Sequence, residues 1–214
     1  MIRRRTAAAA LLALSMGAFG TASASASSSA PGTRSLASVL TADGDRFDRN
    51  WYDYDIVTEA VLAVLAAKPT SPVSVLTKGD VALTAFIPND RAFQVLALDL
   101  THRWIGSEKG VFEALVATLG VDTIEKVLLY HVVPGATIDS ATALRSDGAR
   151  LATALPGASI TVDVGRWSSH PYIRLIDNDR TDWDPFVNLR AVDINLGNQQ
   201  IAHGIVFVLR PVDL

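Results

Sequence analysis

Hydrophobic and polar residues alternate along this chain with two different periods. In DIVTEAVLAVLAAKP, residues 55–69, the apolar positions recur at the spacing of one face of a helix. Asp55 is placed to cap the N-terminus of this helix, and Pro69 to end it. The apolar run ALTAFI, residues 82–87, predicts a strand that is stopped by Pro88.

Three further helices are predicted before residue 130. The first follows Pro88, where Asn89 or Asp90 can accept hydrogen bonds from its free amides. The second is SEKGVFEALVATLG, which ends at Gly120 as its C-terminal stop. The third is VDTIEKVLL, residues 121–129, which begins with a capping-box pattern and runs directly into YHVV.

The second half of the chain has a different pattern. Short β-type runs are separated by Gly, Pro, Asn and Asp. Helices concentrated in the first half and strands in the second predict a single compact α+β domain rather than repeating βαβ units. The predicted strand runs are GARLATALPG (148–157), ASITVDVG (158–165), YIRLID (172–177), VNLRAVDIN (187–195) and HGIVFVLRPV (203–212).

The first residues have the composition of a secretory signal peptide. Three arginines in MIRRRT precede the apolar stretch AAAALLALSMGAFG, and the small residues after it contain Ala-x-Ala cleavage sites. The apolar stretch is too short to span a bilayer comfortably, so a membrane helix is the weaker interpretation. We therefore expect a signal peptide over residues 1–26, a flexible linker over 27–33 and one domain over 34–214.

Cysteine usage and charge narrow the setting and the partners. The chain contains no cysteine, and export without disulfides is typical of a bacterial secreted protein. We expect a secreted product, at most loosely held at the cell surface, with no membrane span after cleavage. The net charge is −3, and removing the signal peptide removes three arginines and no acidic residue. Because nucleic-acid binding requires clustered Lys and Arg, we expect no nucleic-acid partner.

Catalytic and metal chemistry find little support in the sequence. The G-x-S-x-G string of an α/β-hydrolase does not occur, and the four histidines are not at metal-ligand spacing. The carboxylates of IDNDRTDWDP suit Ca²⁺, but a helix-loop-helix calcium loop needs Gly in place of Asp182 and Glu in place of Asn188. We expect a solvated acidic loop over Asp177–Asp184, and no catalytic residue, metal or cofactor.

A second mixed stretch interleaves aromatic residues with aspartates. DRFDRNWYDYD, residues 45–55, contains side chains that can bind sugars by stacking, or can anchor a segment that wraps around a core. We favour anchoring through Phe47 and Trp51.

His131 stands in the otherwise apolar run LLYHVVPGATI, residues 128–138. A buried imidazole is costly unless its nitrogens find hydrogen-bond partners. Strand alternation would place Leu129, His131 and Val133 on one face and Tyr130 on the other. We expect His131 to be a buried, neutral strut that is hydrogen-bonded to the Pro88–Asp90 turn.

Three stretches, in order, resemble the conserved blocks of the fasciclin domain. They are ALTAFIPNDRAF, the Tyr-His stretch LLYHVVPGATI, and the closing stretch IAHGIVFVLRPVDL. Single short motifs are weak signals, whereas three in the right order after a signal peptide are a strong one. The resemblance covers roughly residues 34–214.

This resemblance implies a secreted or surface-exposed domain that acts in adhesion or binding rather than in catalysis. The Tyr-His region of that family is associated with adhesive contacts, so this role falls here on Tyr130 and His131. We place the turn of Pro88, Asn89 and Asp90 in the same candidate binding region. The expected partner is an extracellular protein or a cell-envelope polysaccharide.

The closing stretch departs from the family pattern at three positions. His203 stands where Asn is usual, Phe207 where a second histidine is usual, and Arg210 where Asp is usual. Two other functions stay open: an extracellular carrier of a small hydrophobic ligand, held between the helical half and the strands, and a hydrolase that uses His131.

Overall fold

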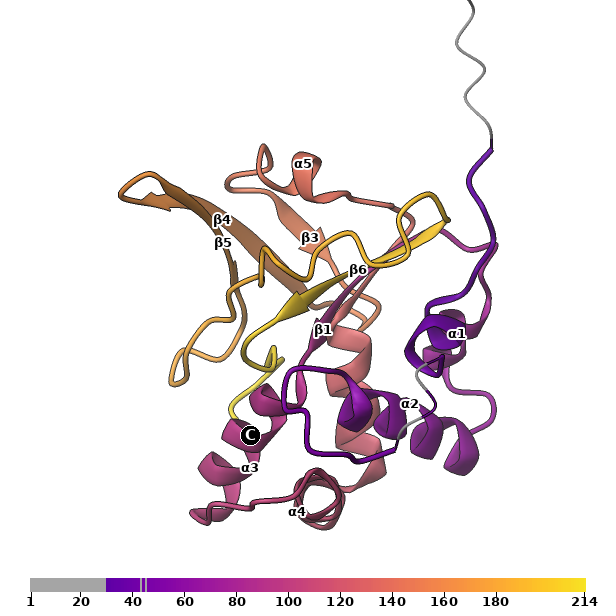
Figure 1. Ribbon diagram of the computed structural model, residues 1–214, viewed down its shortest axis with the longest axis vertical. Helices are drawn as coiled ribbons and strands as arrows, with labels where there is room; N and C mark the ends of the chain where they lie inside the picture. The colour runs from indigo at the N-terminus through magenta and orange to yellow at the C-terminus, as the bar shows by residue number, and fades with distance from the viewer. Residues whose placement is uncertain (1–29, 43, 45) are drawn as a thin grey trace, which may run out of the picture. The chain divides into compact units, whose positions relative to one another are not determined.

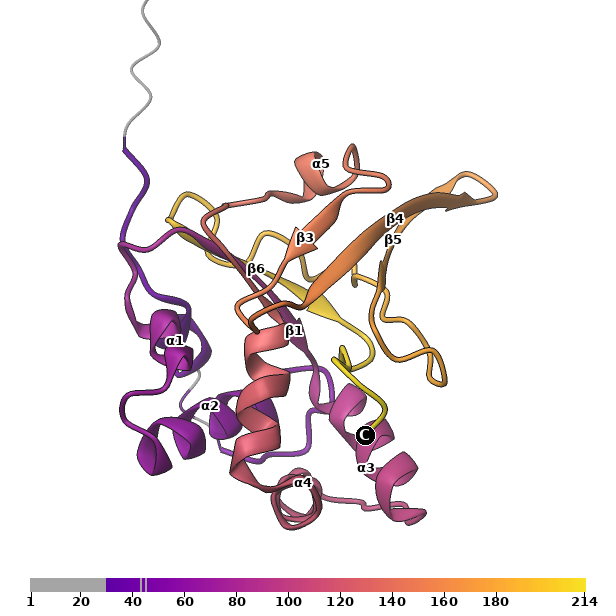
Figure 2. The same ribbon diagram turned by 180° about the vertical axis from the view of Figure 1, so that it is seen from behind.

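The structure is a computed structural model that describes residues 30–42, 44 and 46–214 (Figure 1). The predicted signal peptide, residues 1–26, lies outside the described residues. The helices between residues 36 and 130 gather on one side of strands β1 (Leu83–Pro88) and β6 (Gln200–Ile205), and the strands between residues 150 and 176 lie on the other side (Figures 1 and 2). The predicted α+β class is therefore confirmed.

The last residues of the predicted linker, 27–33, are tied to the domain. From residue 31 onward the chain forms one compact unit. Gly32 donates its amide to the carbonyl of Gly197 over 2.8 Å, and its own carbonyl accepts from the amide of Gln199 over 2.9 Å. The attachment therefore begins before residue 34, where the domain is predicted to start.

Helices form in the predicted regions after Tyr54, Pro88 and Ser107, and three short helices that were not predicted form as well. Pro72, at the start of a 3₁₀ helix, and Asn89, before α3, supply local start signals. No helix in the described part of the chain is long and apolar enough to cross a membrane. The helices are α1 (Leu36–Leu40), α2 (Asp55–Ala67), η1 (Pro72–Thr77), α3 (Asp90–Thr101), α4 (Glu108–Tyr130) and α5 (Ser140–Ala143).

The strands form two sheets. In the first, β1 (Leu83–Pro88) lies between β2 (Val132–Pro134), which is antiparallel to it, and β6 (Gln200–Ile205), which is parallel. The second is antiparallel and contains β3 (Arg150–Ala152), β4 (Ser159–Trp167) and β5 (His170–Ile176) in that order.

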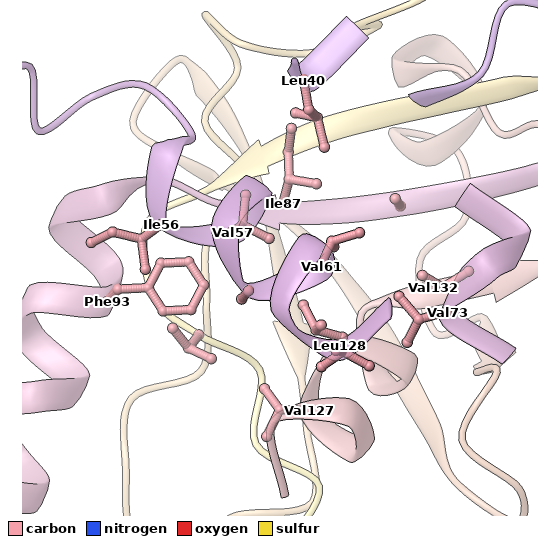
Figure 3. Packing of buried hydrophobic residues seen from close by; sticks show 14 of the residues in the cluster. Leu40, Ile56, Val57, Val61, Val73, Ile87, Phe93, Val127, Leu128 and Val132 are labelled. Atoms are coloured by element: carbon pink, nitrogen blue, oxygen red, sulfur yellow. The ribbon is translucent and has the colours of Figure 1, made fainter. Parts of the chain in front are cut away.

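Strand β1 separates two hydrophobic cores. Because successive side chains of a strand point to opposite faces, Ala85 and Ile87 pack into the helical core while Phe86 packs beneath the second sheet. On the helical side, Val57 and Val61 of α2 lie near Ile87 (Figure 3). Both faces of β1 are thus buried, which explains why its sequence is apolar except for Thr84.

The predicted cap of α2 is wrong. Asp55 is the first residue of the helix, and the capping carboxylate comes from Asp90, 35 residues further along the chain. Asp90 Oδ1 accepts from the amide of Ile56 over 2.9 Å and Oδ2 from the amide of Asp55 over 3.3 Å. The N-terminus of α2 is therefore capped by a residue distant in sequence, Asp90, and not by Asp55 as predicted.

The predicted strand at Tyr130–His131 is also wrong. Helix α4 bends at Gly120, whose φ of 71° and ψ of 162° suit glycine alone, and then continues to Tyr130. His131 follows as its C-cap, with φ −83° and ψ −5°, and β2 begins only at Val132. The apolar run continues from helix to strand without a break, so its pattern does not mark the boundary.

Three predicted strand regions of the second half are shorter than expected, and β3 covers only Arg150–Ala152 of the predicted run 148–157. Residues 187–195 form isolated bridges, Val187 with Ile205 and Ile194 with Ala202, and β6 ends at Ile205 rather than near residue 212. Asp193 and Asn195 have φ values of 58° and 70°, which interrupt an extended chain.

Candidate functional site

His131 joins the end of α4 to the C-terminal segment, which is residues 206–214. Its Nδ1 lies 2.7 Å from the carbonyl oxygen of Val127, and the amide of Leu209 lies 3.0 Å from its Nε2. A carbonyl only accepts, so Nδ1 donates and Nε2 accepts from Leu209. Burial lowers the pKa of His131 to about 4, which keeps the ring neutral. The structure thus contains a buried neutral strut, but its partners differ from the predicted Pro88–Asp90 turn.

Tyr130 packs into the hydrophobic core beneath the second sheet. Its side chain is fully buried with Ile160 and Leu175, and its hydroxyl donates to the carbonyl of Ser159 over 3.0 Å. Burial raises the pKa of Tyr130 above its ordinary value. Tyr130 therefore anchors the start of β4 on the end of α4.

The Pro88–Asp90 turn holds two helix ends. Pro88 is the buried last residue of β1. Asn89 Oδ1 accepts from the amide of Ala92 over 3.0 Å and caps α3, as predicted, while Asp90 caps α2.

All five candidate binding residues are therefore buried. The exposed fraction is 6% for Asn89, 5% for His131 and zero for Asp90 and Tyr130. Their role in binding stays a prediction. Of the five, Asn89 supports α3 and His131 supports the C-terminal segment from inside.

The side chain of Arg210 is buried between α3 and the loop of residues 177–184. The prediction of a solvated acidic loop is wrong for the carboxylates of this loop, which are buried or half-buried around Arg210. Arg210 Nε lies 2.9 Å from Asp182, its Nη1 lies 2.8 Å from Asp99 on α3, and its amide donates to Asp177 over 2.7 Å. Asp179, 5% exposed, lies 3.7 Å from Nη1. The loop folds inward because a buried guanidinium supplies the counter-charge that its carboxylates need.

Burial raises the pKa of two carboxyl groups in the acidic loop, which is residues 177–184. It raises the pKa of Asp182 to about 6, although Arg210 acts to lower it. Burial also raises the pKa of Asp177 to about 7. Arg210 stood out in the sequence as a departure from the closing-block pattern, but only the fold reveals its carboxylate partners.

A pocket of about 750 Å³ lies between α3, the acidic loop and the C-terminal segment. Val95 and Leu98 of α3 line one side, and Trp183 and Phe207 line another. The rings of Trp183 and Phe207 meet edge to face, with centroids 6.0 Å apart. Arg210 also lines the pocket, whose volume is within the range of about 300–1,000 Å³ usual for small-molecule sites.

Large aromatic side chains are unusually exposed on this domain. The exposed fraction is 83% for Trp167, 76% for Trp183 and 59% for Trp104. Trp51 is half-buried, and the guanidinium of Arg91 lies 5.2 Å from its ring and 5.6 Å from that of Trp104. Of these exposed tryptophans, Trp183 borders the pocket.

The family of this chain is given by comparison with protein-family models. The fasciclin domain model matches residues 58–210. A FAS1 domain pair from the insect cell adhesion molecule fasciclin I is similar with a TM-score of 0.49 and 18% identity, over 72% of this chain and 46% of that one. This chain thus spans about half the length of that solved chain. The search of curated proteins finds no match. Since the family model covers most of the chain, this protein belongs to the fasciclin domain family.

Proposed function

We propose that this protein is a secreted, non-catalytic binding domain that recognises an extracellular protein or a cell-envelope polysaccharide through the surface around the α3 pocket. The observation that carries this proposal is Trp183, which is 76% exposed at the edge of a pocket large enough for a ligand group. A large aromatic side chain left in water beside a concave surface is typical of binding sites.

The chemistry of the pocket suits a partner that is partly polar. Trp183 and Phe207 offer ring faces and edges for stacking, and Asp99 and His102 add polar groups at the end of α3. Aromatic rings beside hydrogen-bonding groups recognise sugar rings as well as protein side chains.

The buried candidate residues take a supporting part in this proposal. His131 holds the amide of Leu209, whose neighbours Val208 and Arg210 line the pocket. Asn89 caps α3, the opposite side of the pocket. Catalysis by His131 is disfavoured because both of its ring nitrogens are already bonded to the backbone.

The test is sedimentation of the purified protein with washed cell envelopes or extracellular material of the producing organism. We expect saturable retention that excess unlabelled protein competes away. Parallel samples treated with protease or with periodate distinguish a protein partner from a polysaccharide. No saturable retention by any fraction contradicts the proposal.

A second candidate function is a carrier of a small hydrophobic ligand. The observation that favours it is the apolar part of the pocket wall, which includes Val95, Leu96, Leu98 and Leu214. Native mass spectrometry of the protein as isolated tests this function. A co-purified molecule that is lost when Leu98 is replaced by Asp favours the carrier, and a mass equal to that of the bare chain favours the binding domain.

A further inference from the structure

Three carboxylates from separate parts of the chain converge at the start of α2. Asp53 lies in the turn before α2, Asp90 begins α3, and Glu108 begins α4. One oxygen from each of the three lies within 4.8 Å of the others. Asp90 is fully buried and Glu108 is 1% exposed, so water reaches this cluster poorly.

The side chain of Glu108 has no hydrogen-bond partner in the described part of the chain. Both of its carboxylate oxygens are buried and unpaired, and so is Oδ1 of Asp53. None of the ion pairs recorded for residues 30–42, 44 and 46–214 includes Asp53, Asp90 or Glu108. A buried carboxylate without a partner is strongly unfavourable, so its presence requires a reason.

Helix capping explains Asp90 but leaves Glu108 unexplained. Asp90 accepts from two amides at the start of α2. At α4 that task belongs to Ser107, whose Oγ accepts from the amide of Gly110 over 3.3 Å. The helix dipole favours an acidic residue in the first turn, but it does not provide the missing hydrogen bonds.

Burial and neighbouring negative charges disfavour ionisation of the carboxyl groups in this cluster. Burial, then the charges of Asp48, Asp53 and Asp55, raise the pKa of Glu108 to about 7. Burial, then a hydrogen bond to Asp53, raise the pKa of Asp90 to about 9.

We propose that Asp53, Asp90 and Glu108 bind a divalent cation, and that their carboxylate oxygens suit Ca²⁺. Mg²⁺ dehydrates reluctantly and usually keeps several waters, whereas Ca²⁺ takes most of its ligands as protein oxygens, so a largely buried cluster of carboxylates suits Ca²⁺. Oxygens of Asp48, Asp53 and Asp55 also lie within 4.8 Å of one another, which extends the supply of oxygen ligands on the side of the turn.

The bound ion would fasten three elements together. It would join the turn before α2 to the first residues of α3 and α4, and α3 is one side of the pocket. A ligand that binds the folded chain alone stabilises it, so the ion is expected to raise the melting temperature in a saturable way.

The test compares the full chain with two Glu→Gln variants on the same helix. Glu108→Gln removes the proposed ligand, and Glu113→Gln removes a 63% exposed carboxylate as the matched control. After chelator treatment, Ca²⁺ should raise the melting temperature of the wild type and of Glu113→Gln, with one ion bound by calorimetry. Glu108→Gln should lose this rise, and without Ca²⁺ it should melt at or above the wild-type temperature because an unpaired buried charge is gone.

Two results would overturn the proposal: no Ca²⁺ binding by the wild type, or equal binding by Glu108→Gln. If Glu108→Gln does not fold, Asp53→Asn replaces it, with the same expected loss. Tb³⁺ serves as a local probe, because Trp51 and Tyr54 flank Asp53 and can sensitise its emission. Emission that Ca²⁺ displaces from the wild type and not from Asp53→Asn supports the site, and emission that is equal in both contradicts it.

Discussion

The amide of Leu209 donates to Nε2 of His131 over 3.0 Å, and this bond connects the end of α4 with the segment that lines the α3 pocket. The other ring nitrogen donates to the carbonyl of Val127. A histidine that stands alone in an apolar stretch of sequence is thus the link between a buried helix end and a surface.

Replacing His131 by Leu should destabilise the fold. The variant leaves the buried amide of Leu209 and the carbonyl of Val127 without their partner, at a cost of about 1–3 kcal/mol in the free energy of unfolding. Urea denaturation measures the change. His170→Leu, at an exposed position, is the control and should unfold at the same urea concentration as the wild type. Equal midpoints for wild type and His131→Leu would show that the hydrogen bonds add no stability.

The same histidine predicts a pH dependence. Burial lowers the pKa of folded His131 to about 4, whereas an unfolded histidine titrates near about 6.5. Between these values the unfolded chain takes up a proton at this position and the folded chain does not, so the contribution of His131 is present above pH 6.5 and is lost towards pH 4. The stability difference between wild type and His131→Leu should therefore narrow as the pH falls from about 6.5 to 4. A difference that is constant over this range would show that His131 is already charged in the folded protein.

Arg210 should be among the residues most sensitive to replacement. In Arg210→Met the buried carboxylates of Asp179 and Asp182 lose their counter-charge, and breaking such a buried pair costs about 3–5 kcal/mol. Limited proteolysis should then cut the Asp177–Asp184 loop. Asp99→Asn is the matched control, because the side chain of Asp99 is 56% exposed and its loss should cost less than about 1 kcal/mol. Equal effects of the two variants would mean that the loop does not depend on Arg210.

Local sequence signals predicted helices and strands well where a residue that starts or stops an element stood at the end of a clear pattern of apolar positions. Helix α2, strand β1 and the break at Gly120 are examples. The end of α4 was missed because the apolar run from Val127 to Val133 suits a buried helix and a buried strand equally. Its boundary depends on contacts with both cores.

The sequence predicted the candidate sites less well than the helices and strands, because the residues of each site come together only in the folded chain. Asp53, Asp90 and Glu108 are far apart in the chain, so no sequence window shows them as one cluster. The carboxylates around Arg210 looked like a solvated loop because their counter-charge lies near the C-terminus. The family resemblance pointed to Tyr130 and His131, and the fold places both inside, next to the elements that form the surface.

The most direct test of the proposed binding surface compares two exposed tryptophans. Trp183 borders the pocket, and Trp167, which is exposed to a similar degree, lies at the end of β4. Each is replaced by Ala, and the dissociation constant for the retained partner fraction is measured. An aromatic side chain at the centre of an interface contributes about 2 kcal/mol, so Trp183→Ala should weaken binding by about 30-fold while Trp167→Ala leaves it unchanged. Unchanged binding by a folded Trp183→Ala variant, or an equal loss in both variants, would contradict the assignment of the α3 pocket as the binding surface.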